Sequence, residues 1–184
     1  MRLRFNEAKA TQAASRFLQL RGGAMSYLKL TKLLYLLDRE ALLRWGRTVT
    51  TDRHVSMDRG PVVSRIYDLI VDQVPPGTES VWHRCISEPQ GYEVRLLNPP
   101  DYDELSPAEE QLIDEIFTQH GRKSRWDLVN LCHDLPEWQD PQGSALPIEP
   151  RDILKAGNKT DAEIAAIEGD LESLAVAQTL VSPG

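Results

Sequence analysis

Residues 32–39 read KLLYLLDR, and residues 57–67 read MDRGPVVSRIY. The first stretch lies in a run, residues 26–45, whose apolar side chains cover far more than one face of a helix. Because a helix that is apolar on most sides is buried on most sides, this run predicts the central core helix of the fold. At its solvent-exposed margin we expect the charged residues Lys29, Lys32, Arg39, Glu40 and Arg44.

The second stretch predicts a helix that begins at Gly60-Pro61 and continues to about Val74. Proline suits the first turn of a helix because its φ angle is already close to the helical value. Capping residues and apolar periodicity predict the other helices, at residues 7–20, 107–121, 124–135, 151–156 and from Thr160 onward.

Strands form a minor part of the prediction. Short β-prone pieces occur at residues 49–51 and 54–57, and residues 81–86 and 92–97 flank a polar turn in the manner of a hairpin. The expected fold class is therefore α+β and predominantly α-helical. We expect about six or seven helices around a central buried helix, with one small antiparallel β-sheet or hairpin.

With 184 residues, the chain is long enough for one domain with a sizeable core. We expect this domain to span residues 1–157, with an acidic C-terminal helix and tail, residues 158–184, packed on it. No apolar run reaches the roughly 18–20 residues of a membrane span, and residues 1–6 lack a signal-peptide core. For this reason we expect no membrane partner. Cys85 and Cys132 lie far apart in the sequence, so we expect a reduced, cytoplasmic protein.

The charge is distributed unevenly along the chain. The net charge is −7, but residues 1–50 hold ten Lys/Arg against three Asp/Glu. The remaining residues are strongly acidic, and the C-terminal helix contributes Glu163, Glu168 and Asp170. Such polarity suggests charged partners, but solvated helix faces are the interpretation that we favour for any single patch.

The chain shows no arrangement that predicts catalysis, a metal or a cofactor. Phosphate-binding loops and zinc-ligand spacings are missing from the sequence. Cys132 and His133 are adjacent, and adjacent helical side chains point about 100° apart, so they do not form a nucleophile–base pair. We expect Cys132 to be a small core thiol and His133 to bond a backbone carbonyl at a helix end. Basic residues near the N-terminus raise nucleic-acid binding, but the acidic balance of the whole chain argues against it.

The two opening stretches also carry a resemblance to a known family. Four motifs occur in order. The first is the run Lys32, Leu33, Leu34 and Tyr35, and the second is the segment Gly46-Arg47-Thr48-Val49-Thr50. The third is Gly60, Pro61 and Val62 with Tyr67 after it, and the fourth is His133 with Trp138. In this order the chain resembles the Panacea-domain family, the SocA-like antitoxins of bacterial and phage toxin–antitoxin systems. The resemblance covers roughly residues 13–169 and implies mainly structural roles for these motif residues. Arg59 departs from it, since the family often has an aromatic residue there.

The resemblance implies an antitoxin that binds a cognate toxin protein directly, with no catalytic residues, metal or cofactor of its own. One alternative is an adaptor that delivers the toxin to a protease. Another is a nucleic-acid-binding regulator, such as an autorepressor of a toxin–antitoxin or phage operon, although no helix-turn-helix signature stands out. A homo-oligomer is left open.

Charge and exposure together select the candidate partner-binding residues, which are Lys29, Lys32, Arg39, Arg59, Glu163, Glu168 and Asp170. Lys32 and Arg39 are seven residues apart and therefore lie on nearly the same helix face. A buried core has no need of two cations there. They either pair internally with acids or meet a partner, and internal pairing is the interpretation that we favour.

Overall fold

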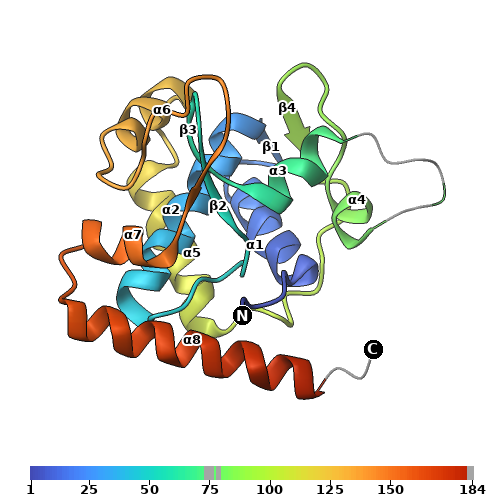
Figure 1. Ribbon diagram of the computed structural model, residues 1–184. Coiled ribbons are helices and arrows are strands. Elements are labelled where there is room, and N and C mark those ends of the chain that lie inside the picture. Colours follow the sequence, from blue (N-terminus) through green and yellow to red (C-terminus); the bar gives the residue numbers. More distant parts are fainter. Residues whose placement is uncertain (73–76, 78–79, 182–184) are drawn as a thin grey trace.

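The computed structural model of the protein describes residues 1–72, 77 and 80–181 (Figure 1). Within these residues the fold is α+β and predominantly helical, as expected, with eight helices and two small antiparallel sheets. The helices are α1 (Glu7–Leu20), α2 (Tyr27–Trp45), α3 (Ser64–Val71), α4 (Val81–Cys85), α5 (Pro107–His120), α6 (Arg125–His133), α7 (Pro150–Ala156) and α8 (Asp161–Val181).

Helix α2 is the centre of the fold, as its sequence predicts. Helices α1, α5, α6 and α7 all contact it, and its apolar residues from Leu30 to Leu42 are buried. The helix ends at Gly46, whose φ of 71° is the left-handed conformation of a helix C-cap. The expected exposed margin is wrong at two positions, because Lys29 is only 7% and Lys32 0% exposed.

The two sheets are small, and each contains the strand that leads into a helix, β1 into α2 and β3 into α3. Strands β1 (Ala24–Ser26) and β4 (Glu93–Arg95) pair antiparallel beside the start of α2. The second sheet has the order β3-β2-β5, with β2 (His54–Met57) between β3 (Gly60–Val63) and β5 (Leu146–Ile148). Residues Asp58-Arg59 form the two-residue turn of the β2–β3 hairpin.

The predicted helix start at Gly60-Pro61 is wrong. Residues 60–63 are strand β3, in which Pro61 lies opposite Ser56, and α3 begins only at Ser64. The first turn of α3 is capped from a distance, since the carboxylate of Asp52 accepts hydrogen bonds from the backbone N–H groups of Arg65 and Ile66. The expected end near Val74 lies outside the described residues.

The predicted hairpin of residues 81–86 with residues 92–97 is also wrong. Residues 81–85 are the short helix α4, which Ser80 caps by accepting a hydrogen bond from the backbone of His83. Strand β4 pairs with β1, about 70 residues earlier in the chain, and the two predicted segments share the isolated bridge of Ile86 with Leu96. Five residues are too few for periodicity to separate a helix from a strand.

Helix α8 runs along one side of the molecule beside α7 (Figure 1). Ile164 is buried in a second apolar cluster with Tyr35, Leu42 and Leu154, and Ile167 and Leu171 pack on it. The backbone of Arg4 also donates a hydrogen bond to Gln178 of α8. Among the described helices, none is both long and apolar enough to cross a membrane.

Leu34 offers a direct test of the central helix. Its side chain is 0% exposed in the main core, so Leu34→Ala should lower the free energy of unfolding by roughly 2–5 kcal/mol. Urea denaturation followed by circular dichroism measures the change, with Leu180→Ala as the control because Leu180 is 80% exposed. A loss below about 1 kcal/mol for Leu34→Ala would show that this face of α2 is not core.

Candidate functional site

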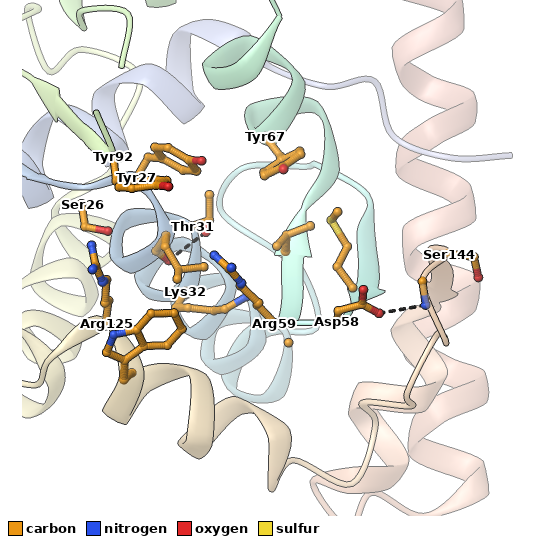
Figure 2. Close-up of a pocket in the computed structure, with 16 residues that line it drawn as sticks. Ser26, Tyr27, Thr31, Lys32, Asp58, Arg59, Tyr67, Tyr92, Arg125 and Ser144 are labelled. Atoms are coloured by element: carbon orange, nitrogen blue, oxygen red, sulfur yellow. Dashed lines mark hydrogen bonds between the residues drawn. The ribbon is translucent and has the colours of Figure 1, made fainter. Parts of the chain in front are cut away.

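A cavity of about 410 Å³ lies where the first half of α2 meets the β2–β3 turn and the start of α6. Cavities of this size are in the range of ligand-binding sites. Its charged and aromatic lining comes from five separate parts of the chain and consists of Tyr27, Lys32, Asp58, Arg59, Tyr67, Tyr92, Arg125 and Trp126. Figure 2 shows Lys32 between Arg59 and Arg125, with the three tyrosines toward one side.

Lys32 is the buried charge of this cavity. Its side chain is fully buried, and its Nζ donates a hydrogen bond to the carbonyl oxygen of Pro61 at 2.8 Å. Within the described part of the chain, no carboxylate lies within 4.0 Å of that nitrogen. Burial lowers the pKa of Lys32 to about 8, because a charged group is poorly solvated there.

Two arginines extend the positive charge toward the mouth of the cavity. The guanidinium carbon of Arg59 lies 5.5 Å from the ring centroid of Trp126, and that of Arg125 lies 5.3 Å from it. Arg125 is also 5.8 Å from the ring centroid of Tyr92. Cation–π contacts of this length hold a guanidinium in place while leaving its N–H donors available.

The turn that carries Arg59 is fixed by two side chains from the end of α6 and the segment after it. The imidazole of His133 bonds the carbonyl oxygen of Asp58 at 3.0 Å, which confirms the expected helix-end role of His133. The indole of Trp138 donates to the carbonyl oxygen of Met57 at 3.0 Å, and the two rings pack 4.2 Å apart. His133 and Trp138 therefore position the neighbouring Arg59.

Gly60 brings the same turn close to Lys32. Its φ of 97° lies in the left-handed region, which side chains disfavour. A Cβ at this position would lie 3.3 Å from the Lys32 Nζ and 3.4 Å from the Cβ of Cys132. The glycine thus leaves room for the lysine ammonium at the edge of the cavity.

Comparison with known protein families identifies a family for the segment that contains most of this cavity. The family described as "Antitoxin SocA-like, Panacea domain" matches residues 30–139. The chain belongs to this family. The curated proteins and the solved structures gave no match. The resemblance seen in the sequence is confirmed, and the family assignment supports a role related to toxin–antitoxin systems and suggests a non-enzymatic one.

The motif residues of the Panacea domain divide into two groups in space. Leu33, Leu34 and Tyr35 are core residues of α2, and Pro61 lies in strand β3. The other motif residues line the cavity or anchor its turn, and these are Lys32, Gly60, Val62, Tyr67, His133 and Trp138. Most of the lining falls within the matched range, so the Panacea domain itself builds this cavity.

Internal pairing with an acid was expected for both Lys32 and Arg39, and within the described residues it holds for Arg39 but is wrong for Lys32, which bonds the carbonyl of Pro61. The Nε of Arg39 bonds Glu137 at 2.6 Å, and the carboxylate of Glu137 is buried and also accepts a hydrogen bond from the hydroxyl of Tyr35. Lys29 donates to the carbonyl of Gly121 at the end of α5. Both contacts lie outside the cavity, and they assign Arg39 and Lys29 to the scaffold of the Panacea domain.

The acidic candidates lie on α8, away from the cavity. Glu163 caps the start of α8 through Thr160, and Glu168 pairs with Arg151 of α7 at 3.1 Å. Asp170 lines a different cavity, of about 790 Å³, between α8, the end of α2 and the start of α5. The structure therefore does not bring these acids together with Lys32 or Arg59.

Asp58 is the acid in the described lining of the cavity that contains Lys32. Its Oδ1 accepts a hydrogen bond from the backbone of Gly143 at 3.0 Å, a contact that Figure 2 shows as a dashed line. Three cations and one carboxylate therefore line this cavity of the Panacea domain. A positively charged cavity in a chain of net charge −7 favours the binding of an anionic group.

Sequence reasoning missed Arg125, Trp126, Tyr27 and Tyr92 as site residues. A capping box, Ser124 with Asp127, predicted the start of α6, but nothing in the sequence indicated what the first turn of α6 faces. Cys132 is a buried thiol whose pKa is raised to about 11 by burial. In the described part of the Panacea domain, no group of three His, Cys, Asp or Glu side chains is arranged to hold a metal ion.

Proposed function

We propose that this Panacea domain neutralises a cognate toxin protein by binding it directly, without chemistry of its own, through the face that contains the basic cavity. The observation that carries the proposal is the convergence of the family motifs on that cavity. Lys32, Gly60 and Tyr67 line it, and His133 and Trp138 anchor the turn that carries Arg59.

The charge pattern supports a protein partner that presents acids to this face. Lys32, Arg59 and Arg125 give the cavity a positive field, although the chain as a whole is acidic. Complementary charge speeds association and selects among partners. The aromatic residues beside the arginines, Trp126 and Tyr92, are 48% and 64% exposed, and such residues are enriched in protein interfaces.

Co-expression tests the proposal. Each open reading frame next to the gene for this chain is expressed alone and together with the tagged chain, and growth is recorded. We expect one neighbour to stop growth alone, to be harmless with the chain, and to co-purify with it as an inactive complex.

Two outcomes would contradict the proposal. Rescue of growth with no physical complex would indicate repression or enzymatic detoxification instead of direct neutralisation. Rescue that is lost when the host proteases are deleted would indicate an adaptor that delivers the toxin for degradation.

A further inference from the structure

We propose that the basic cavity receives an acidic side chain, aspartate or glutamate, from a segment of the toxin, with its carboxylate bonded by Lys32 and flanked by Arg59 and Arg125. The partner in this inference rests on the proposed function. The inference that the cavity binds a carboxylate rests on the contacts of these three cations, and a titration without the toxin tests it separately.

Lys32 supplies the first argument. An ammonium group has three N–H donors, and within the described residues the one acceptor of Lys32 is the carbonyl of Pro61. The side chain is fully buried and lines the cavity, so its remaining donors are not directed to bulk solvent. A buried charge is normally paired or hydrogen-bonded, and here a carboxylate in the cavity would complete the pairing.

The arginines supply the second argument, because both are oriented before any partner arrives. Arg59 and Arg125 lie 5.5 and 5.3 Å from the ring centroid of Trp126, and Arg125 lies 5.8 Å from that of Tyr92. Guanidinium groups bind carboxylates through two parallel N–H donors, and a preoriented group loses less entropy on binding.

The contacts of Trp126 favour an acidic side chain over a flat aromatic ligand. Two guanidinium groups already lie near its ring, and their N–H donors suit a carboxylate better than a neutral ring. Asp58 does not supply the missing carboxylate for Lys32, because it accepts from Gly143 and lies beyond ion-pair distance of the ammonium. Within the part of the chain that the structure describes, no carboxylate of the protein itself pairs with the Lys32 ammonium, so a partner's carboxylate is the group that these cations suit.

Free probes test the chemistry of the cavity without the toxin. The full chain is titrated with acetylated tetraglutamate amide, the matching tetraglutamine amide and inorganic pyrophosphate, each at millimolar concentration. The indole N–H signal of Trp126 is followed by NMR, and that of Trp45, which lies at the far end of α2, is the internal control. We expect tetraglutamate alone to shift the Trp126 signal saturably, and Lys32→Met to abolish the shift.

The complex with the toxin tests whether an acidic side chain of that protein occupies the cavity. Affinity is measured for Lys32→Met and for the double variant Arg59→Gln/Arg125→Gln. Lys29→Met is the matched control, because Lys29 is a buried lysine of the same helix that bonds a carbonyl outside the cavity. Removing one member of a desolvated charge pair should weaken binding about thirty-fold or more, and Lys29→Met should bind within about threefold of wild type.

The outcomes separate this inference from the proposed function. Unchanged toxin affinity in Lys32→Met and in the double variant would overturn the inference and leave direct neutralisation standing. A shift of Trp126 by pyrophosphate and not by tetraglutamate would also overturn it, because the cavity would then select phosphate. If the wild-type chain binds no toxin, the proposed function fails, and the peptide titration alone decides the chemistry of the cavity.

Discussion

Lys32→Met should raise the stability of the free protein at pH 7 while it weakens the complex with the toxin. The pKa of Lys32 is lowered from 10.5 to about 8, because burial disfavours its charged form. At about 1.4 kcal/mol for each pH unit, holding the charge costs the folded state roughly 3 kcal/mol at pH 7. The variant loses the hydrogen bond to Pro61, worth about 1 kcal/mol, so we expect a net gain of about 1–3 kcal/mol.

The pH dependence identifies the source of the gain. Because the folded-state pKa of Lys32 lies below the unfolded value, the unfolded chain binds more protons between about pH 8 and 10.5. The cost of the ammonium is therefore complete below pH 8 and disappears as the pH rises toward 10.5. The advantage of Lys32→Met should be largest near pH 7 and should shrink toward pH 10.

Urea denaturation of wild type and Lys32→Met at several pH values between 7 and 10 measures this difference. The wild-type curve alone is not diagnostic, because the neighbouring Cys132 has its pKa raised to about 11 and acts in the opposite direction above pH 9. A variant that is less stable than wild type at pH 7 would show that the ammonium supports the fold instead of serving a partner.

Asp38→Ala should destabilise the protein by about 3–5 kcal/mol, since it removes the acceptor of four buried donors. The carboxylate of Asp38 accepts from the backbone N–H groups of Val49 and Thr50, each at 2.9 Å. It also accepts from the hydroxyl of Thr50 and lies 3.0 Å from the Nε2 of His54. These bonds attach the segment before the β2–β3 hairpin to α2, so their loss also loosens the turn that carries Arg59.

Thermal unfolding checks the effect of Asp38→Ala, with Asp101→Ala as the control because Asp101 is exposed. For a chain of this size, 1 kcal/mol corresponds to about 2–4 °C in Tm, so the melting temperature should fall by roughly 6–20 °C. The control should change the stability by no more than about 0.5 kcal/mol. An equal, small effect of both substitutions would refute the role given to this network.

Much of the fold follows from local sequence. The all-round apolar pattern of residues 26–45 and the capping box of Ser106 with Glu109 are read directly from the chain, and the structure places α2 and α5 there. The start of α3 is different, because its first turn is capped by Asp52, more than ten residues earlier in the segment before β2. Local patterns do not contain that information.

The candidate site is predictable only in part, for the same reason. The family motifs pointed to Lys32, Gly60 and His133, but the cavity that the first two line and the turn that His133 anchors depend on how α6 packs on the β2–β3 turn. The burial of Lys32 was missed because lysines on a helix usually reach solvent, and Arg125 carried no local signal at all. Tertiary packing, not composition, assembles this site.

We propose that the chain neutralises its toxin by binding it through the cavity face. The most direct measurement follows toxin activity and complex formation in one titration of purified toxin with the wild-type chain and with Lys32→Met. We predict that wild type abolishes toxin activity in step with complex formation, and that Lys32→Met, though folded and more stable, requires about thirty-fold more protein or higher. A toxin that stays active in a saturated wild-type complex would contradict the claim.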